Sequence, residues 1–153
     1  IHERAEVIRS GTQWNKVEQN LKEVIASGIK PSPSITVSVM NVHRLRNIID
    51  HLIDIGICVD RIGFNMLHSP DHYNISVMND AAKKKVLSDI MNMILDYRIQ
   101  YNFNMKEKLQ QIIAQLKTPQ DYYGSMKLEI ISHKIDVIRK ENLFNSIPEL
   151  KSN

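Results

Sequence analysis

The spacing of apolar residues switches between two periods in the first half of the chain, and this switching restricts the fold more than any other feature. Apolar and aromatic residues recur at helical spacing over 14–25, and Gly28 offers a left-handed stop. Residues 34–40 (SITVSVM) then alternate β-branched residues with Thr, Ser and Met, which predicts a strand. A second helical pattern covers 42–53, and residues 60–67 (DRIGFNML) predict a second buried strand. Two strands joined by a helix of this length predict a right-handed parallel βαβ crossover, the unit of open doubly wound sheets and (β/α) barrels.

The second half of the chain predicts helices. A polar loop after the second strand is followed by helical patterns near 80–98, 105–117 and 119–141. With 153 residues, the chain has the usual length of one domain. We therefore expect a partial α/β core at residues 1–78 and a helical extension at residues 79–153 that packs on it.

Composition restricts the partners and the compartment. The net charge is +3, but the 20 basic residues are interspersed with 17 acidic ones, so we expect no nucleic-acid partner. The single cysteine, Cys58, excludes an intrachain disulfide, and its apolar neighbours predict a buried structural thiol. No apolar run approaches the length of about 18 residues that a membrane span needs. We expect a cytoplasmic protein that makes no membrane contact.

Short motifs point to no catalytic or metal centre. His68 and His72 flank Asp71 at a spacing that could hold a metal on a helix, but Pro70 disfavours a helix there and no second ligand cluster lies nearby. The run Lys83–Lys85 fits a solvated helix face better than a phosphate site. The G-x-S-x-G, Walker-type, G-x-G-x-x-G and H-E-x-x-H motifs do not occur in the sequence. We therefore assign no catalytic and no metal-binding residues.

The predicted strand ends are the better candidates for a site. In parallel α/β architectures the loops at the carboxyl ends of the strands face one crevice and carry polar groups on a rigid scaffold. Asn41 and Asn65 place an amide at each predicted strand end, where a ligand could meet a donor and an acceptor together. Each amide could equally cap the following helix or turn.

Four segments together resemble the later part of a radical S-adenosylmethionine (SAM) enzyme. Residues 3–21 resemble the helix after the fourth barrel strand, residues 34–57 resemble the fifth strand with its helix, and residues 61–70 resemble the sixth strand. Residues 133–150 are similar to the last helix and tail of the twitch-type group of these proteins, with the matching positions Asp136, Arg139, Pro148, Glu149 and Leu150. The resemblance implies an α/β fold: a partial (β/α) barrel with two parallel strands and a predominantly helical C-terminal half.

Members of this family cleave SAM reductively with a 4Fe–4S cluster and so form a 5′-deoxyadenosyl radical. Their cluster is held by a three-cysteine loop that this sequence does not contain, and their Ser-x-Asp-like strand end is also missing from it. Because several thiolates are needed to hold such a cluster, the single cysteine is insufficient. We expect the chain to be the C-terminal half of such an enzyme, inactive by itself and without a cofactor of its own.

The resemblance also assigns part of a SAM-binding surface. Arg9 matches an arginine that faces the methionine carboxylate in related enzymes, and a guanidinium fork suits that group. Asn41 and Leu67 match positions that flank the adenosine, and Asn65 adds the second strand-end amide. The alternative is a non-enzymatic protein–protein interaction module. In both cases unpaired strand edges predict a homodimer or higher homo-oligomer. The sequence does not indicate which substrate the enzyme would use.

Overall fold

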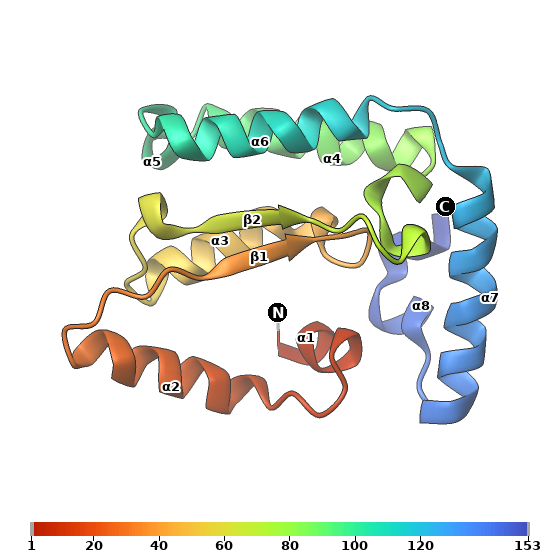
Figure 1. Cartoon of the computed structure of the whole chain (residues 1–153), viewed down its shortest axis with the longest axis horizontal. Coiled ribbons are helices and arrows are strands. Elements are labelled where there is room, and N and C mark those ends of the chain that lie inside the picture. Colours follow the sequence, from red (N-terminus) through yellow and green to blue (C-terminus); the bar gives the residue numbers. More distant parts are fainter. Residues whose placement is uncertain (1, 153) are drawn as a thin grey trace.

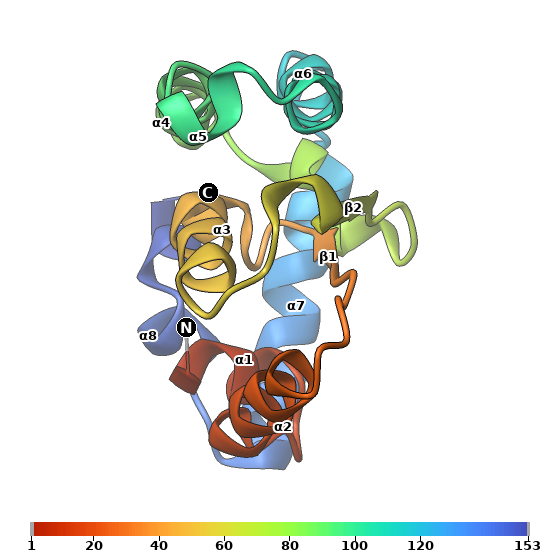
Figure 2. The same cartoon turned by 90° about the vertical axis from the view of Figure 1, so that its left-hand side faces the viewer.

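The computed structural model describes residues 2–152, and most of these residues form helices around two short strands. The strands are β1 (Ser34–Val37) and β2 (Gly63–Met66). Figures 1 and 2 show α1 and α2 on one side of the strands and α4, α5 and α6 on the opposite side. The helices are α1 (His2–Ile8), α2 (Trp14–Ala26), α3 (Leu45–Asp54), α4 (Asp80–Ile94), α5 (Tyr97–Gln100), α6 (Phe103–Leu116), α7 (Tyr122–Arg139) and α8 (Leu143–Ser146).

The two strands pair in parallel, as their sequence pattern predicts. Ser34 pairs with Gly63 and Val37 pairs with Met66 at the two ends of the register, and α3 lies on the chain between the strands. Along β1, Ile35 and Val37 are buried, whereas the Ser and Thr that alternate with them are exposed. This period of two places apolar side chains on one face of the sheet and polar side chains on the other.

The predicted fold class is wrong: the described residues do not form a partial (β/α) barrel. Helical elements account for 67% of the chain, and the sheet in residues 2–152 consists of two four-residue strands. A (β/α) barrel is closed by eight tilted strands, so two strands define neither its ring nor its interior. The protein is a mostly helical small domain that contains one parallel βαβ unit.

Side-chain caps fix the starts of most helices in the second half. The capping side chains accept a hydrogen bond from a backbone N–H in the first turn, and they belong to Asn79, Asp96, Asn102, Asp121 and Asn142. The helical pattern predicted over 80–98 is therefore interrupted, because Asp96 starts α5 as a separate short helix. At the end of α2, Gly28 has a φ of 84°, in agreement with the predicted left-handed stop.

One continuous apolar core holds the two halves of the chain together. It runs from Val37 and Ile49 in the βαβ unit to Ile90 and Leu109 in the helices above it. The C-terminal tail also packs onto this core, because Leu150 is almost completely buried. Among residues 2–152, no helix combines the length and the apolar character needed to cross a membrane.

Two side chains lie differently from what the sequence predicts. Cys58 is exposed rather than buried, because it precedes a short turn before β2 and its Sγ lies 3.7 Å from the Asp60 carboxylate. Lys83 is buried rather than solvated, and its Nζ donates a hydrogen bond of 2.8 Å to the Thr118 carbonyl. This burial lowers the pKa of Lys83. Lys84 and Lys85 are exposed, as expected.

Candidate ligand-binding cleft

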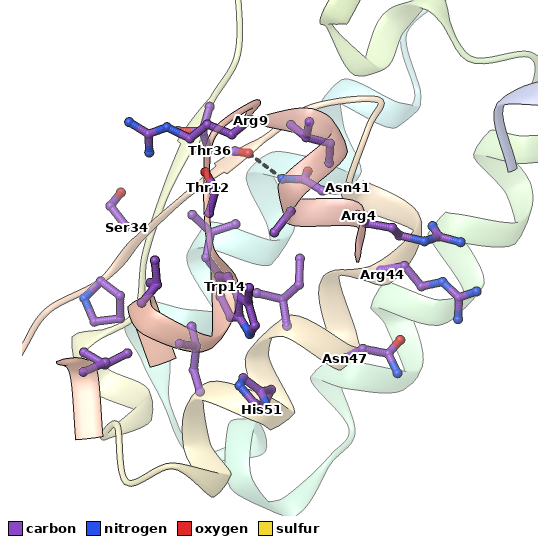
Figure 3. Close-up of a pocket in the computed structure, with 18 of the residues that line it drawn as sticks. Arg4, Arg9, Thr12, Trp14, Ser34, Thr36, Asn41, Arg44, Asn47 and His51 are labelled. Carbon is purple, nitrogen blue, oxygen red and sulfur yellow. Dashed lines mark hydrogen bonds between the residues drawn. The ribbon is translucent and has the colours of Figure 1, made fainter. Parts of the chain in front are cut away.

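A large cleft separates α1 and α2 from β1 and α3, and we call it the β1–α2 cleft (Figure 3). Its volume is about 1360 Å³. The first wall includes Arg4, Arg9, Trp14 and Val17, and the second includes Ser34, Thr36, Asn41 and His51. Small-molecule sites usually measure about 300–1,000 Å³, so the cleft has room for a ligand of nucleoside size or larger.

Asn41 shapes the second wall at the carboxyl end of β1. Its Nδ2 donates a hydrogen bond of 2.8 Å to the Thr36 carbonyl, as Figure 3 shows, and its Oδ1 accepts one of 3.0 Å from the Ser38 backbone N–H. The amide therefore holds the turn after the strand, which is the structural role that the sequence left open for it. A primary amide has a further N–H and lone pair, so Asn41 can still meet a ligand at the cleft.

Arg9 lies just after α1 and is exposed at the same cleft. Two other arginines of the lining are already engaged, because Arg4 and Arg44 each lie 2.9 Å from a carboxylate oxygen of Glu149. Burial by itself would raise the pKa of Glu149. The hydrogen bond from Arg4 and the charges of both arginines outweigh it and hold that pKa below its ordinary value. Arg9 is therefore the better placed of the three arginines to meet an added anion.

Asn65 and Leu67 do not line the cleft, unlike Arg9 and Asn41. Asn65 is exposed on β2, where it pairs in register with Thr36, and its Nδ2 donates a hydrogen bond of 2.9 Å to the Ser34 Oγ. Asn65 thus touches a residue of the cleft wall without lining the cleft itself. Leu67 is half-buried after β2, and its backbone N–H donates to the Val37 carbonyl. Arg9 and Asn41 therefore both line the cleft, whereas Asn65 and Leu67 lie outside its lining.

A polar cluster between α2 and α3 was not predicted from the sequence. The rings of Trp14 and His51 lie 6.1 Å apart, and His51 Nε2 lies 3.2 Å from a carboxylate oxygen of Glu18. A hydrogen bond from Lys22 is the main cause that lowers the pKa of Glu18. The signal for this cluster was a lone tryptophan at the start of an amphipathic helix, which is also typical of an ordinary core position.

The two histidines of the polar loop differ, and protein contacts hold His72. His72 is buried, its ring lies 4.3 Å from that of Tyr73, and its Nδ1 lies 3.4 Å from Asp71. His68, in contrast, is exposed. Across residues 2–152, no three His, Cys, Asp or Glu side chains gather closely enough to hold a metal ion.

Comparisons with known proteins found no similar protein. The chain matches no protein family, no curated protein and no solved structure.

Proposed function

We propose that this chain is the C-terminal portion of a radical SAM enzyme and that it contributes a SAM-binding surface at the β1–α2 cleft. The single observation that carries the proposal is that Arg9 and Asn41, both assigned from the resemblance, line the same large cleft beside the carboxyl end of β1. The exposed guanidinium of Arg9 can bind the methionine carboxylate in a bidentate manner. The hydroxyl groups of Ser34 and Thr36 and the amide of Asn41, which all line the cleft, can pair with the nucleoside.

The residues of this chain do not fit an iron–sulfur cluster. Cys58 is the single cysteine of the sequence, it is exposed beside Asp60, and it does not belong to the lining of the cleft. Because a 4Fe–4S cluster needs several thiolate ligands, the cluster of the proposed enzyme requires cysteines outside these 153 residues. The chain by itself is therefore inactive in the reductive cleavage of SAM.

A SAM titration tests the binding half of this proposal. Isothermal titration calorimetry of the chain should detect a complex, and Arg9→Ala should weaken it about tenfold by removing one charged pair. Lys84→Ala is the matched control, because it removes an exposed cation on α4 and should leave the affinity unchanged. The absence of binding at about 1 mM SAM, or equal affinity of the wild type and Arg9→Ala, would refute the proposed site.

Two measurements test the proposed relation to a larger enzyme. Anaerobic reconstitution followed by iron and sulfide analysis should find no stoichiometric cluster on this chain. Uptake of one cluster per chain would overturn the conclusion drawn from the lone thiol. The genomic DNA upstream of the codon for Ile1 should encode a cysteine triplet in the same reading frame. A start codon directly before Ile1 would instead favour an independent module.

A second candidate function is a non-enzymatic protein–protein interaction module, and the surface of α7 favours it. Tyr123, Met126, Ile130 and Val137 lie along one side of this helix, and each is more than half exposed. Exposed apolar stripes of this kind are typical of association surfaces. We propose that α7 contributes to the homodimer or larger homo-oligomer expected from the sequence.

Light scattering coupled to size-exclusion chromatography tests the oligomer. The wild-type chain should elute as a dimer or larger assembly at about 100 µM, and Ile130→Glu should shift it towards the monomer. Lys84→Glu introduces the same side chain on α4 and should leave the mass unchanged. A monomeric wild-type chain would contradict this part of the proposal.

A further inference from the structure

The second edge of β1 faces the β1–α2 cleft rather than another strand. The Gly63 N–H donates to the Pro33 carbonyl, and the Leu67 N–H donates to the Val37 carbonyl, so the odd-numbered residues of β1 direct their backbone groups towards β2. In a parallel pair, alternate residues direct their backbone groups to opposite edges. The backbone N–H and C=O groups of Ser34 and Thr36 therefore point to the edge that borders the cleft.

Asn41 already occupies the carboxyl end of this edge in the way that a neighbouring strand would. It donates to the Thr36 carbonyl and accepts from the Ser38 N–H, which are two edge groups of successive even-numbered residues. A strand edge that is capped at one end is available for pairing along the rest of its length. Within residues 2–152, the groups left for an incoming partner are the Ser34 N–H, the Ser34 carbonyl and the Thr36 N–H.

The opposite wall of the cleft, formed by α2, carries apolar side chains that the rest of the protein covers only in part. All 13 residues of α2, each of which the structure describes, are exposed or half-buried. Val17 on the cleft wall is 44% exposed, although it belongs to the apolar stripe of an amphipathic helix. Helices in proteins are stabilised mainly by burying such a stripe. The strand edge and the half-covered stripe lie on facing walls of the same cleft.

We infer that the β1–α2 cleft receives one extended polypeptide segment, which pairs with the Ser34–Thr36 edge and covers the apolar stripe of α2. A helix does not fit these observations, because its backbone groups are bonded internally and cannot pair with a strand edge. The edge-to-edge pairing of two copies of β1 does not fit either, because α1 and α2 stand in front of this edge (Figures 1 and 2). A single strand supplies backbone donors and acceptors on one side and alternating side chains for the apolar wall.

The occupant is thus defined by its chemistry. It is a short extended segment with apolar side chains at alternate positions, and it pairs over a few residues because Asn41 closes the end of the edge. Arg9 and Lys16 line the cleft together with two aspartates, Asp54 and Asp50, and Asp50 is already paired with arginines. The remaining charge of the lining is positive, so acidic residues at the ends of the segment fit better than basic ones. This inference does not depend on SAM binding, and a peptide titration without SAM separates the two.

Trp14 supplies a direct reporter, since it is the single tryptophan of the chain and lines the cleft. The probe is a soluble seven-residue peptide with three valines at alternate positions, two threonines between them and a glutamate at each end. When this peptide is added, we expect a saturable change in Trp14 fluorescence. In the complex, nuclear magnetic resonance should show at least tenfold slower hydrogen exchange of the Thr36 amide. The Ile35 amide is the internal control, because it already faces β2.

Two further peptides test whether backbone pairing carries the binding. One is N-methylated at the valine amides and the other at the threonine amides. Because alternate residues of a strand direct their N–H groups to opposite edges, one of the two peptides loses the donors that face β1, and both keep their side chains. That peptide should bind at least tenfold more weakly, and the other should bind like the parent. Because the protein is wild type in this comparison, a folding defect cannot explain the result.

A matched pair of variants tests the α2 wall. Val17→Glu places a charge in the cleft and should weaken peptide binding at least tenfold, whereas Ala26→Glu adds the same charge on α2 outside the cleft lining and should not. Circular dichroism must show equal helicity for both variants. No saturable binding to the wild type at about 1 mM peptide, equal affinity of both methylated peptides, or an unchanged affinity of folded Val17→Glu would overturn the inference.

Discussion

Four charged side chains join α3 to the start of α5, and replacing one of them gives a sharp test of the fold. Arg46 and Asp50 on α3 contact Asp96 and Arg98 in an alternating ring. Arg46 Nε lies 3.2 Å from Asp50, and Arg98 Nη2 lies 2.7 Å from Asp50 and 3.1 Å from Asp96. Arg46 also hydrogen-bonds Asp96. Asp96 caps α5 as well, since its Oδ1 accepts the Arg98 backbone N–H.

The ring lowers the pKa of Asp96 below that of an ordinary aspartate. Hydrogen bonds from the Arg98 side chain and backbone are the main causes, and together with the charges of both arginines they lower the pKa of Asp96 from 3.8 to about 2. At about 1.4 kcal/mol per pH unit, this shift sets an upper limit of about 2 kcal/mol. Because the Arg46 side chain is 40% exposed and that of Arg98 is 25% exposed, solvent screening reduces the contribution to about 1 kcal/mol.

Asp96→Asn keeps an acceptor for the helix cap but removes the charge. We expect the free energy of unfolding at pH 7 to fall by about 1 kcal/mol. The folded-state pKa of Asp96 lies below its unfolded value of 3.8, so the stabilisation is fully present above pH 5 and disappears as the pH falls through about 2. The difference between the two proteins should therefore shrink over the same interval.

Urea unfolding followed by circular dichroism at pH 7, 5, 3 and 2 measures this difference. Asp89→Asn, which neutralises an exposed aspartate on α4, is the control and should change the stability little at any of these pH values. Equal stability of the wild type and Asp96→Asn at pH 7 would refute the electrostatic reasoning. A deficit that stays constant down to pH 2 would also refute it, because that result would assign the loss to packing.

Three further predictions concern packing and exposure. Gly124→Ala should destabilise the protein by about 1–3 kcal/mol in urea unfolding, because the new Cβ would lie 2.6 Å from Asp121 Oδ2 and 2.8 Å from Val77 Cγ1; an unchanged midpoint would contradict this. Cys58 should react with Ellman's reagent at least half as fast in the folded protein as in urea, and strong protection of the folded thiol would contradict its exposure. Ile49→Ala should lose about 2–5 kcal/mol of stability, since this side chain is fully buried in the core, and a loss below about 1 kcal/mol would contradict that burial.

The apolar patterns of the sequence predict the local order of elements, whereas the predicted barrel architecture is wrong. The helix, strand, helix and strand of residues 14–66 occur in the predicted order, because apolar periods of 3.6 and 2 are local properties that short segments carry themselves. A barrel depends on the pairing and closure of many strands, and no single segment encodes these long-range contacts. In the second half of the chain, α4, α5 and α6 cover the sheet from one side, and α7 lies beyond the ends of the strands (Figure 1).

The amino-acid sequence by itself determined the two strands, the helical second half and the left-handed stop at Gly28, because each follows from neighbours a few residues apart. Tertiary structure alone decided that Arg9 and Asn41 share a cleft, that Asp96 meets Arg46 across 50 residues of chain, and that Cys58 faces solvent. These outcomes depend on how elements pack against one another. A side chain's partners across the fold are set by that packing and not by its neighbours in sequence.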